Sequence, residues 1–100
     1  MADIHKLADE QFMISGNFTN VLRGDILDPD ACLVYAEDRN GAVVTSTVID
    51  VSTLIVVGGV LRVRVRGGTF ALSPYHIKLI AETLGGNRWI IPVVMHIDEE

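Results

Sequence analysis

The chain has 100 residues, of which 49% are hydrophobic and 21% are charged, and its formal net charge is −5. This length predicts a single domain, and the composition is too apolar for a disordered chain. The acidic balance argues against general nucleic-acid binding, which requires an excess of Lys and Arg to neutralise phosphates. The longest apolar runs, such as residues 54–57, are far shorter than the ~20 residues that span a bilayer, so we expect no membrane partner.

The beginning of the chain carries no sign of a targeting signal, because residues 1–10 contain no basic region followed by an apolar segment. We therefore expect synthesis and folding in the cytosol. The single cysteine, Cys32, excludes an internal disulfide and cannot form a thiolate metal site alone. Residues 1–10 are also polar and weakly patterned, which is compatible with a short helix but favours an N-terminal arm. The folded domain is then predicted over residues 11–100.

The next part of the chain has the pattern of short strands separated by turns. Residues 12–18 suggest a first strand with a glycine bend, and residues 28–30, Asp-Pro-Asp, form a turn cluster. Residues 31–37 are rich in Leu, Val and Tyr and predict another strand. The dipeptide Asn40-Gly41 predicts a hairpin turn, and residues 42–49 are the predicted partner strand.

The most informative stretch is residues 60–69, where apolar residues alternate with arginine up to a pair of glycines. Because successive side chains of a strand point to opposite faces, one face would line a core and the other would carry arginines. The core residues would be Leu61, Val63 and Val65, and the arginines are Arg62, Arg64 and Arg66. Residues 54–57 and the glycines after them predict a hairpin with this strand.

The last third contains one ambiguity, in residues 74–83. Ser73-Pro74 could cap a helix there, but the alternation of apolar and polar residues after Tyr75 favours a strand. The final segment, residues 88–98, alternates as well, with Trp89 on its apolar face and Pro92 on the other. Proline within a strand favours an edge position.

Six or seven short strands with turns between them predict an all-β fold, an antiparallel, immunoglobulin-like β-sandwich with a short N-terminal arm. Tyr75 lies near the start of the penultimate predicted strand, where the tyrosine corner of an immunoglobulin-like domain would be.

No group of residues has the spacing of a catalytic, cofactor or metal site. His5, His76 and His96 are scattered along the chain, and we interpret them as ordinary surface histidines. The serines lack a glycine-elbow context, and the glycine pairs are typical of turns between strands rather than of phosphate-binding loops. We therefore predict no enzymatic activity, no cofactor and no metal.

The arginine stripe, defined as Arg62, Arg64 and Arg66, has two interpretations. It could be a solvated strand face that blunts pairing at a sheet edge. It could also be a contact surface, because guanidinium groups bind carboxylates of a partner in a bidentate manner. Together with the apolar Trp89, these arginines are our candidate protein-binding residues.

Four segments, taken in order, resemble a family of small proteins of tailed bacteriophages. They are residues 18–25 with Phe, Leu and Gly-Asp, residues 44–48 with Val-Thr-Ser-Thr, residues 65–69 with Gly-Gly-Thr, and residues 75–83 with a leading Tyr and a final Thr. The resemblance spans about residues 12–98. It departs at residues 89–92, Trp-Ile-Ile-Pro, where the family has a more polar alternation.

The resemblance implies an immunoglobulin-like fold, a strand over residues 75–83 and a virion role as a capsid-associated or head-to-tail junction component. The expected function is then a non-enzymatic structural protein, assembled in the host cytoplasm and located in the virion. Its expected partners are other virion proteins or copies of itself. A phage- or bacteria-encoded adaptor or inhibitor that binds a soluble partner is the alternative.

Overall fold

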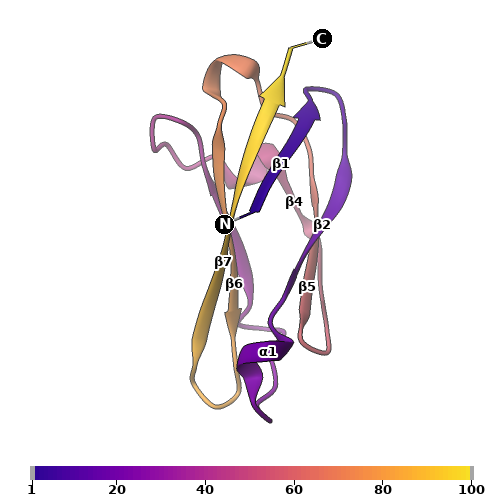
Figure 1. The fold of residues 1–100 in the computed structure, drawn as a ribbon, viewed down its shortest axis with the longest axis vertical. Coiled ribbons are helices and arrows are strands. Elements are labelled where there is room, and N and C mark those ends of the chain that lie inside the picture. The colour runs from indigo at the N-terminus through magenta and orange to yellow at the C-terminus, as the bar shows by residue number, and fades with distance from the viewer. Residues whose placement is uncertain (1, 100) are drawn as a thin grey trace.

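The structure is a computed structural model that describes residues 2–99 as a sandwich of two β-sheets (Figure 1). The strands are β1 (Ala2–Leu7), β2 (Phe12–Asn17), β3 (Leu33–Glu37), β4 (Ile49–Val57), β5 (Val60–Val65), β6 (Tyr75–Glu82) and β7 (Arg88–Asp98). The short helices are α1 (Thr19–Leu22), α2 (Thr45–Val48) and the 3-10 turn η1 (Phe70–Leu72). The four-stranded sheet has the order β1-β7-β6-β3 and the three-stranded sheet the order β2-β5-β4. β3, β6 and β7 share one sheet and β2, β4 and β5 the other, as the corresponding strands do in immunoglobulin-like domains, whereas β1 joins the sheet of β7. The predicted fold class, an all-β sandwich, is therefore confirmed.

The strand with alternating arginines is β5, the central strand of the three-stranded sheet. Its three apolar side chains, Leu61, Val63 and Val65, are fully buried between the sheets. The predicted hairpin with the preceding strand is present, because β4 and β5 pair antiparallel and Gly58 at their turn has φ +59. The period-two pattern therefore identified both the strand and its core face correctly.

Tyr75 confirms that residues after Pro74 form a strand and not a helix. It is the first residue of β6, only 2% of its surface is exposed, and its hydroxyl accepts a hydrogen bond from the Thr69 N–H at 3.0 Å. A tyrosine hydroxyl bonded to backbone a few residues upstream is the arrangement of a tyrosine corner. The corner fixes the path of the chain from η1 into β6.

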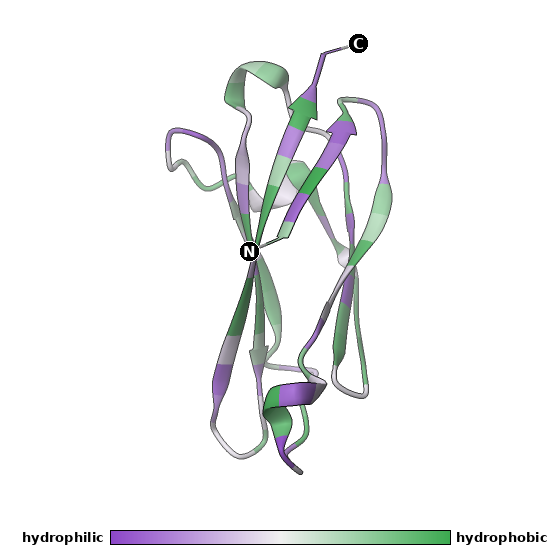
Figure 2. Ribbon diagram, viewed as in Figure 1, coloured by the Kyte–Doolittle hydropathy of each residue, from purple (hydrophilic) through white to green (hydrophobic). Residues whose placement is uncertain are grey.

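The expected N-terminal arm is a strand in the structure. β1 lies at the edge of the four-stranded sheet and pairs parallel with β7, from Ala2 opposite Val93 to Leu7 opposite Asp98. Figure 2 shows hydrophobic and hydrophilic residues mixed along β1. The pattern is hard to recognise because Lys6 takes an inward position, with only 1% of its surface exposed.

Three backbone carbonyls explain how a lysine fits this position. The Lys6 ammonium donates to the carbonyls of Leu7, Ala8 and Glu10 at 2.9, 3.0 and 3.0 Å. These carbonyls belong to the end of β1 and the turn that leads to β2, so one cation holds the turn together. Burial lowers the pKa of Lys6, and the carboxylates of Glu10 and Asp9 oppose that shift.

The predicted strand over residues 42–49 is also wrong. The Asn40-Gly41 turn is present, with Gly41 at φ +84, but after one bridge between Glu37 and Val43 the chain enters α2. The cause is Thr45, whose hydroxyl accepts the Ala36 N–H at 3.0 Å and so replaces a partner strand. The helical turn carries the chain from one sheet to the other.

Candidate protein-binding site

Arg62 and Arg64 are exposed on the outer face of the three-stranded sheet, as the sequence predicted. β5 has β2 on one side and β4 on the other, so these arginines are not at a sheet edge. Protection of an edge, one of the two interpretations of the stripe, therefore does not apply to them. Within residues 2–99, neither guanidinium has a carboxylate within 4.0 Å.

Arg66 differs from the other two arginines, because it is used within the fold. It lies just beyond β5, its guanidinium donates to the Ser46 carbonyl at 2.9 Å, and it lies 3.8 Å from a carboxylate oxygen of Asp50. Arg66 thus ties the end of β5 to α2 and to β4. Within the stripe, Arg62 and Arg64 are the two arginines whose guanidinium groups make no such bond with residues 2–99.

A bulge in β4 lies beside the exposed arginines. The register between β4 and β5 shifts between Asp50, opposite Arg64, and Ile55, opposite Arg62. Within the bulge the Thr53 hydroxyl accepts the Arg64 N–H at 2.9 Å and donates to the Asp50 carbonyl at 2.6 Å. A side chain therefore replaces a strand carbonyl there, and the bulge fixes the backbone that carries the arginines.

Asp50 gives this face a local negative charge. The Ser52 hydroxyl donates to its carboxylate at 2.6 Å. This hydrogen bond, and then the positive charges of Arg66 and Arg64, lower the pKa of Asp50, so the group remains ionised at neutral pH. The charge of the outer face is therefore positive at Arg62, whereas near Asp50 the carboxylate offsets the positive charges of Arg64 and Arg66.

Trp89 is 39% exposed and lies near the start of β7, in the four-stranded sheet. The structure therefore does not bring it together with the arginine stripe on one sheet. It does border two hollows, of about 500 and about 120 Å³, which share Trp89 and Val21 of α1. The larger also touches Arg23, Asp25 and Asn87. The smaller is mainly apolar, and its lining includes Phe18, Ile90 and Ile91.

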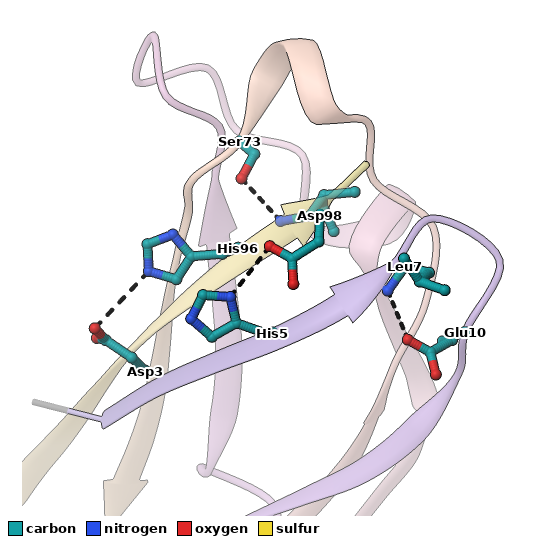
Figure 3. Close-up of polar contacts among 8 residues, drawn as sticks. Asp3, His5, Leu7, Glu10, Ser73, His96 and Asp98 are labelled. Atoms are coloured by element: carbon teal, nitrogen blue, oxygen red, sulfur yellow. Dashed lines mark hydrogen bonds and ion pairs between the residues drawn. The ribbon is translucent and has the colours of Figure 1, made fainter. Parts of the chain in front are cut away.

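Two histidines that are far apart in the sequence meet on the outer face of the four-stranded sheet (Figure 3). The rings of His5 and His96 are stacked with their centroids 4.6 Å apart. His5 Nδ1 lies 3.2 Å from an Asp98 carboxylate oxygen, and His96 Nε2 lies 3.8 Å from one of Asp3. No local signal could have predicted this cluster, because it depends on parallel pairing of segments from the two ends of the chain.

The described part of the chain, residues 2–99, contains no group of three His, Cys, Asp or Glu side chains arranged to hold a metal ion. Cys32 is buried, and burial raises the pKa of its thiol. Over the same residues, no helix has the length and apolar character needed to cross a membrane.

Comparison of the chain with models of known protein families finds no match, and comparison with curated proteins finds none either.

Proposed function

We propose that the chain is a non-enzymatic structural protein of a tailed bacteriophage particle. In this proposal several copies assemble in the host cytoplasm and dock onto capsid, portal, neck or tail components, or onto one another. The resemblance of the ordered sequence segments to small phage proteins supports the virion role. The immunoglobulin-like strand arrangement and the tyrosine corner are compatible with that resemblance.

The observation that carries a binding role is the exposure of Arg62 and Arg64 on a central strand of an acidic protein. Both guanidinium groups lack a carboxylate within 4.0 Å in the described residues, and the chain has a net charge of −5. Guanidinium groups bind carboxylates with fixed, bidentate geometry. A single exposed pair contributes only about 0 to 1 kcal/mol, so the surface becomes effective when both arginines, repeated over many copies, are partly buried by a partner.

Mass spectrometry of purified particles tests the virion role directly. We expect the chain in particles purified through two density gradients, at a constant ratio to the major capsid protein. Its absence from such particles would contradict the virion role and favour an adaptor or inhibitor that acts on a soluble partner.

The double variant Arg62→Ser, Arg64→Ser tests the surface. We expect a thermal midpoint close to that of the wild type, since neither guanidinium is used within the fold, and loss of the chain from particles. The matched control is Arg39→Ser, Lys78→Ser, which removes the same charge from exposed positions outside the stripe and the two hollows. Incorporation of the stripe variant at the wild-type level would assign Arg62 and Arg64 to solubility alone.

A further inference from the structure

The two halves of β7 have different surroundings on the side away from β6. Residues 93–98, the covered segment, pair with β1. Residues 88–92, the free segment, pair with β6 but with no strand of residues 2–99 on the other side. The free segment is nevertheless apolar at the surface, with Trp89 39% and Ile90 49% exposed.

The hydrogen-bond phase of the β6–β7 ladder shows which backbone groups of the free segment point outward. Thr83 N–H donates to the Asn87 carbonyl at 2.9 Å, and Ile97 N–H donates to the Ser73 hydroxyl at 2.9 Å. Odd-numbered residues of β7 therefore direct their backbone groups toward β6. In an antiparallel ladder the intervening residues direct theirs the other way. Arg88 and Ile90 thus each offer an N–H and a C=O at the edge.

Pro92 fits the same phase. It lies opposite Lys78, at a position whose backbone nitrogen points away from β6, so its missing N–H costs the β6–β7 ladder nothing. It also lies next to Val93, where pairing with β1 begins. Pro92 therefore separates the covered segment from a short free edge centred on Ile90.

The hollows lie beside this free edge. The smaller one is bounded by Trp89, Ile90 and Ile91 on β7 and by Phe18 and Val21 across from them. The larger one continues past Trp89 toward Arg23. An unpaired strand edge beside an apolar hollow is the arrangement by which added strands are recognised, with main-chain bonds for affinity and side-chain pockets for specificity.

We propose that the free segment of β7 accepts an extended segment of a different protein, which adds as an edge strand and places apolar side chains in the smaller, mainly apolar hollow. β1 shows the kind of occupant, since it is an extended segment lying along the same edge of the same strand. The occupant has apolar side chains at alternate positions, because successive side chains of a strand point to opposite faces and only one set reaches that hollow. The identity of the partner as a virion protein rests on the proposed function, whereas binding at this edge does not.

The probe for the test is the peptide acetyl-Thr-Val-Thr-Val-Thr-Val-Thr-amide. Trp89 is the only tryptophan, so its fluorescence reports on this site alone. We expect a saturable change in Trp89 emission together with slower exchange of the Ile90 amide hydrogen, by about tenfold at saturation. The control peptide has an N-methyl group on every residue, which keeps the side chains but removes every main-chain donor whichever direction the peptide runs, and it should produce neither effect.

Ile90→Pro is the decisive variant, because its nitrogen points outward as that of Pro92 does, so the fold should tolerate it. We expect it to lose the response to the peptide, whereas Ile90→Val should keep it. If Ile90→Pro does not fold, comparison of the unmodified and N-methylated peptides with the wild-type protein still tests whether binding requires main-chain pairing. Equal binding of the N-methylated peptide, or no response up to the solubility limit of the unmodified one, would overturn the proposal.

Light scattering on the free protein measures its oligomeric state and so tests whether a second copy of the chain occupies the edge. A dimer that dissociates in Ile90→Pro would mean that a second copy takes the edge, which would also overturn the proposal. We expect a monomer. None of these measurements uses particles, so their failure is distinct from absence of the chain from the virion.

Discussion

The covered and free segments of β7 form one continuous strand with the same partner, β6, yet only one of them is closed at its edge. On the covered segment, Val93, Met95 and Ile97 are buried. On the free segment, the apolar side chains of Trp89 and Ile90 remain partly exposed. Hydrophobicity alone therefore does not decide whether this edge is buried.

The difference arises from what β1 supplies. β1 pairs in parallel with β7, its Lys6 ammonium binds three backbone carbonyls (the carbonyl cage), and its His5 ring stacks on His96. None of these contacts reaches Pro92 or the free segment. The apolar edge of β7 is therefore covered where a second strand pairs with it and is held there by its own side-chain contacts. Within residues 2–99, no strand does this for the free segment.

Lys6→Met should produce the largest effect and act on the covered segment. The variant removes the ammonium while it keeps an unbranched apolar chain in the buried position. Loss of three charged hydrogen bonds, partly offset by hydration of the turn, should lower the free energy of unfolding by about 3 kcal/mol. Urea denaturation measures this loss, and hydrogen exchange should accelerate in residues 93–98 more than in residues 88–92.

Lys78→Met is the matched control, because Lys78 is exposed on β6. The Lys78 ammonium lies 5.9 Å from the centroid of the Tyr35 ring, so this substitution should lower the free energy of unfolding by at most about 1 kcal/mol. Equal losses for both lysine variants would mean that the carbonyl cage does not fasten β1.

Gly16→Ala should have a smaller effect and act on the free segment. Gly16 lies on the inner face of β2, and a Cβ there would lie 2.8 Å from Leu79 Cδ1 and 3.1 Å from Ile91 Cδ1. Overpacking at this site should cost about 1 to 2 kcal/mol and displace Ile91. Thermal unfolding measures the loss, and a change in Trp89 emission should accompany it.

Ser15→Ala, at the exposed neighbouring position on the outer face of β2, is the control for Gly16→Ala and should leave both readouts unchanged. If Gly16→Ala instead left Trp89 emission as in the wild type, the packing behind the free segment would not be coupled to its edge.

Local periodicity predicted β5 and β7 and favoured a strand over a helix for β6, because each alternates within its own sequence. It failed for β1, where the buried Lys6 breaks the apolar pattern, and for α2, where the Thr45 hydroxyl substitutes for a strand. In both places a polar side chain takes over a backbone or core role. Such a role for a polar side chain can be recognised only when the three-dimensional positions of its partners are known.

The candidate site shows the same limit. The exposure of Arg62 and Arg64 followed from the period of two, but the bond from Arg66 to Ser46 depends on where α2 lies. The hollows beside Trp89 depend on α1, which comes from another part of the chain. The stack of His5 on His96 depends on pairing between segments from opposite ends.

Asp25→Asn should have the smallest effect, and it depends on pH. Asp25 accepts hydrogen bonds from Ile26 N–H, Gly85 N–H and the Asn87 amide, so it holds the β6–β7 loop beside the free segment. Its hydrogen bond with the Thr83 side chain, followed by the other donors, lowers the pKa of Asp25 below its usual 3.8.

Because this pKa is lower in the folded state, the unfolded chain takes up the proton first as the pH falls. The contribution of Asp25 to stability is therefore present above its usual pKa and is lost as the pH falls through the folded value. Urea midpoints should show Asp25→Asn to be less stable than the wild type at neutral pH, with the difference closing as the pH falls below the usual Asp value of 3.8. Asp30→Asn, at an exposed turn position, is the control and should leave the urea midpoint at neutral pH unchanged. A difference between wild type and Asp25→Asn that stays constant from neutral to acid pH would assign the effect to shape and not to charge, and the loop would then not be held beside the free segment by its carboxylate.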